Sequence, residues 1–167
     1  MSDENINYLK NLSRSVQIDP KTMFKIMAME SGGNPNAIST SGAIGDYQII
    51  NATAEGLGVK DRFDPDQNIR GGVILAKQNV DALNKAKLEP SEENIYMMHQ
   101  LGQPVGLEVI KAKRDGTPLS KLSKAATDAM SLNYASDSGT VSEYIDRNMQ
   151  HLNDQYDKVF GKTLNFQ

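Results

Sequence analysis

Apolar residues recur at helical spacing along most of the chain. Between residues 5 and 16, apolar side chains stand at Ile6, Leu9, Leu12 and Val16, which share one face of a helix. The same criterion predicts further helices at residues 21–31, from about residue 51, from residue 65 onward, and at 91–101, 105–113, within 119–130 and at 141–160. The pattern therefore indicates a mainly helical protein.

Polar residues and glycines mark where these helices begin and end. Asp19 precedes a proline, which is typical of an N-cap followed by proline in the first turn of a helix. Gly32 is the first of two glycines and ends that helix, while Ser91 is a second N-cap and Gly102 interrupts the pattern again. Glu30 consequently falls in the last turn of a well-bounded helix.

Evidence for strands is confined to one short stretch. Residues 32–47 are too rich in Gly, Asn and Ser for a long regular element. Within the chain, Tyr47–Ile50 is the only extended candidate, with a possible partner near Ile38. No repeat or linker divides the sequence, so we expect residues 1–167 to form a single mainly α domain with at most a very small β element.

Composition excludes several classes of protein. The 167 residues can bury one sizeable core, and a net charge of −3 supplies no positive field for nucleic acid. No apolar run approaches the roughly 20 residues that cross a membrane, and the polar N-terminus lacks the apolar stretch of a signal peptide. With no cysteine and two histidines, a zinc site is not expected. We therefore predict no membrane span, no signal peptide and no metal site.

Glu30 is the most informative residue. On a helix it shares one face with Met23, Ile26 and Met27, so a carboxyl group lies on the stripe that faces the interior. Burial and the helix dipole at this C-terminal end both favour the neutral, protonated acid. A protonated carboxyl near neutral pH is what a general acid requires. From the pattern alone, a solvated or ion-paired glutamate at the edge of the stripe explains the residue as well.

The segment 42–49 carries a second, weaker signal. Gly42 and Gly45 lie three residues apart outside any helix, which suits close approach of the backbone to another group. Tyr47 and Gln48 follow, and an aromatic ring and an amide can stack on a sugar and bond to its acetamido group. A tight turn leading into a small hairpin accounts for the same residues.

Together these segments resemble the lytic transglycosylases of the goose-type, lysozyme-like SLT family. Residues 29–35 (MESGGNP) resemble the family's E-S-x-x-N-P signature, and residues 39–49 (STSGAIGDYQI) its S-x-x-G-A-x-G-L-M-Q-I block. Further blocks follow in the family's order at residues 51–54, 57–59, 64–73, 96–102 and 144–145. The resemblance covers about residues 20–150 and implies a lysozyme-like fold.

Several positions depart from the family pattern. Asp46 and Tyr47 replace the usual Leu-Met pair, and Asn51 replaces a proline. His99 and Gln100 stand where most members carry Tyr and Asn, in a form similar to that of phage and specialised secretion-type members. Asp46 thereby adds a second carboxyl group that a transglycosylase does not need.

The resemblance implies an activity and a set of site residues. It implies that Glu30 is the single catalytic acid and base, which cleaves the bond between N-acetylmuramic acid (MurNAc) and N-acetylglucosamine (GlcNAc) in peptidoglycan and forms 1,6-anhydroMurNAc. Ser31 would orient Glu30 or touch the acetamido group, and Tyr144 would hydrogen-bond Glu30. The other expected substrate-binding residues are Tyr47, Gln48, Tyr96, His99 and Gln100. No metal or organic cofactor is needed.

Other functions remain open at this point. Asp46 leaves a hydrolytic muramidase possible, in which this second carboxylate activates water. The domain can also be a non-catalytic glycan-binding module or a structural component of a phage particle. For the enzyme, we expect peptidoglycan strands as partner, with phage virion, tail or ejection proteins as further partners. Its expected location is the virion, or the host cytoplasm followed by delivery to the periplasm and cell wall for phage entry or lysis.

Overall fold

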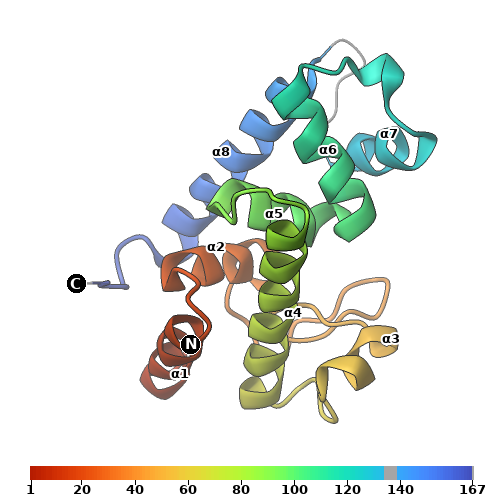
Figure 1. Cartoon of the computed structure of the whole chain (residues 1–167). Coiled ribbons are helices and arrows are strands. Elements are labelled where there is room, and N and C mark those ends of the chain that lie inside the picture. Colours follow the sequence, from red (N-terminus) through yellow and green to blue (C-terminus); the bar gives the residue numbers. More distant parts are fainter. Residues whose placement is uncertain (134–138, 167) are drawn as a thin grey trace. The chain divides into compact units, whose positions relative to one another are not determined.

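The computed structural model describes residues 1–133 and 139–166 of the chain (Figure 1). Within these residues it contains eight α-helices, two short 3-10 helices and no sheet. The α-helices are α1 (Asp3–Ser15), α2 (Pro20–Ser31), α3 (Asn51–Ala54), α4 (Pro65–Lys85), α5 (Glu92–Leu101), α6 (Gln103–Asp115), α7 (Lys124–Ser131) and α8 (Val141–Phe160). The 3-10 helices are η1 (Glu55–Leu57) and η2 (Leu119–Lys121). The mainly α prediction is confirmed.

The predicted helix boundaries agree closely with those observed. Asp19 caps α2 by accepting a hydrogen bond from the Lys21 amide at 2.9 Å, and Gly32 ends the helix with a left-handed φ of 65°. Ser91 caps α5 in the same manner. Gly102 does break the helical pattern, but α6 resumes immediately at Gln103, two residues earlier than predicted.

The small β element consists of two isolated bridges. Ile44 pairs with Ile49 on one side and with Ile38 on the other, both antiparallel. The sequence predicted that the stretch Tyr47–Ile50 pairs near Ile38. That pairing is wrong, because Ile44 lies between the two and takes both partners.

By its internal contacts the chain forms two compact units, which we describe separately. Unit 1 comprises residues 1–77 and the chain from Leu152 onward, and unit 2 comprises residues 78–151. In unit 1, the fully buried Phe24 of α2 packs edge-on against Phe160 and Phe166, with ring centroids 5.5 and 5.6 Å apart. The prediction of a single domain stays a prediction.

Unit 2 is built around α5 and α6, which pack closely. A Cβ on Gly106 of α6 would lie 2.9 Å from the Met98 sulfur, so the missing side chain permits this approach. Along α8, helical spacing predicts an inner face with Ile145, Met149, Leu152 and Tyr156. The structure instead buries Asn148, which is 1% exposed, and leaves Met149 only partly covered.

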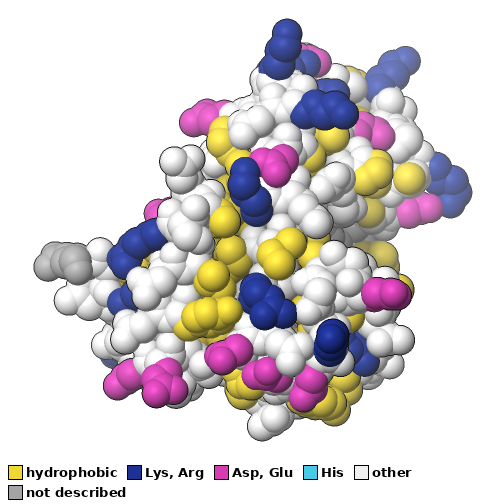
Figure 2. All heavy atoms as spheres, turned by 60° about the horizontal axis from the view of Figure 1, so that its bottom comes forward, with side chains coloured by type: hydrophobic (Ala, Val, Ile, Leu, Met, Phe, Trp, Pro, Cys, Tyr) yellow, Lys and Arg dark blue, Asp and Glu magenta, His cyan; other side chains and the backbone are white. Residues whose placement is uncertain are grey.

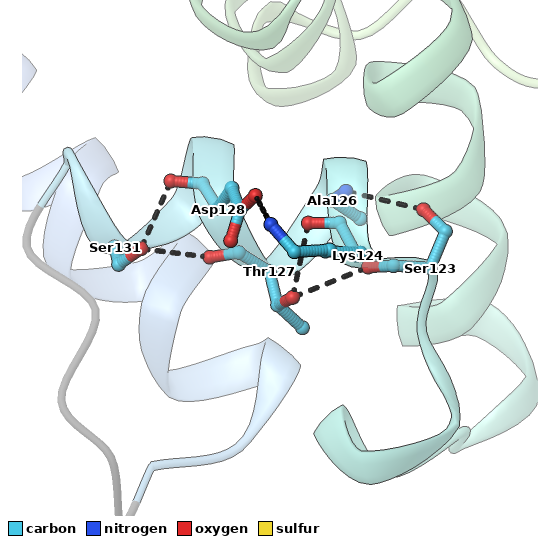
Figure 3. A network of polar contacts seen from close by, with 6 residues as sticks. All are labelled: Ser123, Lys124, Ala126, Thr127, Asp128 and Ser131. Carbon is cyan, nitrogen blue, oxygen red and sulfur yellow. Dashed lines mark hydrogen bonds and ion pairs between the residues drawn. The ribbon is translucent and has the colours of Figure 1, made fainter.

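The start of α7 is stabilised from inside and outside the helix. The Ser123 hydroxyl accepts the Ala126 amide at 3.1 Å and donates to Glu108 at 2.7 Å, and the Ser123 amide donates to the other Glu108 oxygen. Lys124 and Asp128 form an ion pair one turn apart (Figure 3). The two bonds from Ser123 to Glu108 join the start of α7 to α6 within unit 2.

The surface carries both signs of charge. On the face shown in Figure 2, Lys and Arg side chains are interspersed with Asp and Glu side chains. Across the described residues, none of the helices combines the length and apolar character needed to cross a bilayer.

Candidate active site

Glu30 lies at the half-buried end of an otherwise buried helix face. Met23, Ile26 and Met27, which share that face of α2, are each at most 1% exposed, whereas Glu30 is partly exposed one residue before the helix ends at Ser31. A carboxyl group in this position is near low-dielectric side chains and still reachable by a ligand. The predicted placement of Glu30 on this face is confirmed.

Ser31 connects the end of α2 to the loop that follows. Its hydroxyl donates to the carbonyl oxygen of Asp46 at 2.8 Å and accepts the amide of Gly33 at 3.1 Å. The side chain is thus held by its neighbours in unit 1. The hydrogen bonds place Ser31 where it limits movement of the backbone that carries Glu30.

Asn68 organises the loop that contains residues 44–47. It is fully buried, accepts the Tyr47 amide at 2.8 Å, and donates to the carbonyls of Ile44 and Arg62, both at 2.9 Å. A Cβ on Gly45, whose φ is 85°, would collide with the Asn68 amide and lie 2.7 Å from the Arg62 carbonyl. Sequence reasoning assigned Asn68 no role, although a polar residue beside Ile69 on an apolar helix stripe was the available signal.

Tyr47 is a core residue. Its side chain is 4% exposed, its hydroxyl donates to the Met23 carbonyl at 2.9 Å, and burial raises its pKa well above the ordinary value. A Cβ on Gly72 would collide with the ring, so α4 lies directly against it. With both ring faces inside unit 1, Tyr47 offers no surface for stacking on a sugar, contrary to the expectation from sequence.

Gln48 is partly exposed and held in an unusual backbone conformation. Its φ is 50°, and its side-chain nitrogen donates to the carbonyls of Ala37 at 3.1 Å and Gly45 at 3.0 Å. Both N–H groups are engaged by the loop, so the amide oxygen is the atom left to meet a ligand.

Asp46 is buried without full hydrogen bonding. The residue is 2% exposed, and its Oδ2 has no hydrogen-bond partner among the described residues. Because burial disfavours the charged form, the pKa of Asp46 is raised to about 6. A carboxyl group enclosed in this way is poorly placed to activate a solvent water molecule.

Four of the expected site residues belong to unit 2. Tyr96, His99 and Gln100 lie on α5, and Tyr144 lies on α8. The structure brings two of them into contact, since the Tyr144 hydroxyl donates to Gln100 Oε1 at 2.7 Å. Tyr96 and Tyr144 are 3% and 4% exposed, whereas His99 and Gln100 are partly exposed. Burial also raises the pKa of Tyr144 above its ordinary value.

Metal-ligating side chains do not gather anywhere in the described part of the chain. No group of three or more His, Cys, Asp or Glu residues there has the geometry to hold an ion.

A family model, the transglycosylase SLT domain, matches residues 7–98. The chain belongs to this family. The match includes Glu30, Ser31, the loop with Asp46 and Tyr96, and ends just before His99. This SLT domain thus has its candidate acid inside the matched region, while Gln100 and Tyr144 lie beyond it.

Named relatives agree with the family. The SLT domain is 42% identical over 69 residues to a transglycosylase of Enterobacteria phage PRD1. The aligned residues make up 41% of this chain and 26% of the phage protein. It is also 42% identical over 79 residues to a membrane-bound lytic murein transglycosylase F of Yersinia pestis. This alignment covers 47% of this chain and 16% of that protein. The similarity thus spans 26% of the phage relative and 16% of the Yersinia relative.

Proposed function

We propose that this SLT domain is a peptidoglycan lytic transglycosylase that cleaves the β-1,4 bond between MurNAc and GlcNAc. The observation that carries the proposal is the family match over residues 7–98, with Glu30 at the partly exposed end of a buried helix face. The names of the phage and Yersinia relatives, both transglycosylases, support the same reaction class.

In the proposed reaction, Glu30 acts first as acid and then as base. Its proton passes to the glycosidic oxygen while the bond from the MurNAc anomeric carbon to that oxygen breaks, and GlcNAc leaves with a free hydroxyl. The MurNAc C6 hydroxyl then attacks the anomeric carbon and returns its proton to Glu30. The products are 1,6-anhydroMurNAc and a GlcNAc end, no water is consumed, and one carboxyl group suffices because the N-acetyl oxygen stabilises the positive centre.

The other site residues are assigned supporting roles. Ser31, through its bond to the Asp46 carbonyl, holds the backbone beside Glu30 in place. Gln48 presents its amide oxygen to the acetamido N–H of the glycan. In unit 2, the partly exposed His99 and Gln100 contact sugar hydroxyls or acetamido groups, and the buried Tyr96 and Tyr144 support them.

We further propose that the enzyme serves a phage, either for local cell-wall penetration at entry or for lysis. Similarity to a phage PRD1 transglycosylase supports this context. Detection of the protein in purified particles by mass spectrometry tests the virion location, and its absence from particles but presence in infected cells would favour a lysis enzyme.

The decisive experiment is mass spectrometry of purified peptidoglycan after digestion. Wild-type protein should release muropeptides that end in 1,6-anhydroMurNAc, one water lighter than reducing ends, and Glu30→Gln should release none. Reducing ends would refute the transglycosylase and indicate a muramidase, which the burial of Asp46 disfavours. No product from wild type would leave a glycan-binding or structural role.

A further inference from the structure

Gln100, Tyr144 and Asn148 of unit 2 form a closed ring of hydrogen bonds through their side chains and the Tyr144 backbone carbonyl. The Tyr144 hydroxyl donates to Gln100 Oε1 at 2.7 Å, and Gln100 Nε2 donates to Asn148 Oδ1 at 2.7 Å. Asn148 Nδ2 closes the ring on the Tyr144 carbonyl at 2.8 Å and also donates to the Asn133 carbonyl at 3.0 Å. Asn148 is only 1% exposed, so its side-chain amide depends on these protein partners for its hydrogen bonds.

The two backbone carbonyls determine the direction of every bond in the ring. A carbonyl oxygen only accepts, so the Asn148 side chain must turn its nitrogen to Tyr144 and Asn133. Its oxygen therefore faces Gln100, which must present its own nitrogen there. Gln100 Oε1 then faces the Tyr144 hydroxyl, and that hydroxyl must donate its proton.

This order defines what Gln100 and Tyr144 can offer to a ligand. Gln100 spends one N–H on Asn148 and keeps the second for an acceptor such as a sugar or acetamido oxygen. Tyr144 has given its proton to Gln100, so its oxygen retains only the capacity to accept. A buried apolar residue at position 148 would pack on the same stripe of α8. It would leave the Gln100 amide and the Tyr144 hydroxyl free to exchange their donor and acceptor roles.

We propose that Asn148 is a positioning residue for glycan binding, which fixes the side-chain amide of Gln100 so that the glycan meets an N–H donor there. The proposal rests on the proposed function and extends it to a residue beyond the family match, which ends at residue 98. Asn148 acts through Gln100 and does not itself touch the substrate.

Binding of a GlcNAc–MurNAc tetrasaccharide, measured by calorimetry in a Glu30→Gln background that prevents turnover, tests the proposal. Asn148→Leu should raise Kd roughly tenfold, the value of one well-oriented hydrogen bond. Asn79→Leu is the matched control: Asn79 is also buried in unit 2, at 2% exposure, and accepts from Gln103 at 3.2 Å. Asn79→Leu removes a buried amide from the same unit without touching Gln100, and it should leave Kd unchanged.

A double-mutant cycle separates positioning from general loosening of the fold. If Asn148 acts through Gln100, then Asn148→Leu should add nothing to the Kd of Gln100→Ala. Independent, additive losses would overturn the proposal, as would an equal rise of Kd in the Asn79→Leu control.

The orientation of Gln100 can be read without any ligand. In the NMR spectrum of the free protein, the side-chain N–H protons of Gln100 should have shifts displaced from those of an exposed glutamine, and Asn148→Leu should move them toward the exposed values. Unchanged Gln100 signals, in a wild type that still produces 1,6-anhydroMurNAc, would overturn this proposal alone. A wild type that produces no such ends would overturn the proposed function and, with it, the role in glycan binding.

Discussion

Asp46 should make unit 1 less stable at neutral pH than at acid pH. Its carboxyl group is 2% exposed, Oδ2 has no partner among the described residues, and burial raises its pKa from 3.8 to about 6. Below pH 3.8 the folded and unfolded forms are both protonated. As the pH rises through this range the unfolded chain loses its proton first, so stability falls, and it levels off above about pH 6.

The size of this effect follows from the pKa shift. A shift from 3.8 to about 6 corresponds to about 3 kcal/mol of unfolding free energy lost at pH 7.5 relative to pH 3.5. Replacing Asp46 by Leu removes the titrating group and puts a larger apolar side chain in its place. The effect of the new side chain on packing is the same at both pH values. The buried charge is therefore measured by how much the stability difference between variant and wild type changes from one pH to the other.

Urea denaturation of wild type and Asp46→Leu at both pH values measures this difference. The variant should gain about 3 kcal/mol relative to wild type between pH 3.5 and 7.5. Asp46→Asn is a second neutral variant and should show the same pH difference, although its amide adds N–H groups that need partners. If the two proteins differ equally at both pH values, Asp46 is not a buried charge and the reasoning is wrong.

Three further predictions, one of them with a matched control variant, have defined outcomes. Glu30→Gln should lower the rate of muropeptide release at least ~100-fold, the usual contribution of a general acid. Its thermal melt by circular dichroism should be unchanged, and near-wild-type release would refute the role of Glu30. Gly45→Ala should cost more than about 2 kcal/mol by thermal denaturation, because its Cβ meets Asn68 and the Arg62 carbonyl. Gly42→Ala, at a similar φ of 84° but with open space around it, should cost only about 1–2 kcal/mol, and equal losses would contradict the collision. Ser123→Ala should lower the free energy of unfolding by about 1 kcal/mol, because it removes the N-cap of α7 and a hydrogen bond to Glu108. An equally large loss in a Glu108→Ala background would show that the bond to Glu108 adds nothing to stability.

Local features of the structure were predictable from sequence because their causes are local. The start of α2 at Pro20 depends on the capping side chain of Asp19 and its end on a glycine that reaches φ 65°, both readable from neighbouring residues. The placement of Glu30 on the apolar face follows from helical spacing alone. The order of the motifs likewise predicted the SLT family, which the match over residues 7–98 establishes.

Polar contacts between distant segments were not predictable in this way. Tyr47 looked like a sugar-stacking residue, but its neighbours across space are Gly72 and the Met23 carbonyl, and these place it in the core. Helical spacing puts Met149 on the inner face of α8, whereas the structure buries the adjacent Asn148. Spacing alone does not show which of two adjacent residues faces inward.

The sequence by itself therefore determined the helices, their limits, the placement of Glu30 and the family, all of which depend on residues a few positions apart. Tertiary structure alone decided the state of the polar groups. Asp46 became a buried carboxyl, and Gln100 became tied to residues 44 and 48 positions away along the chain. The physical reason is that desolvation and hydrogen-bond direction depend on the atoms that folding brings together, whatever their distance in sequence.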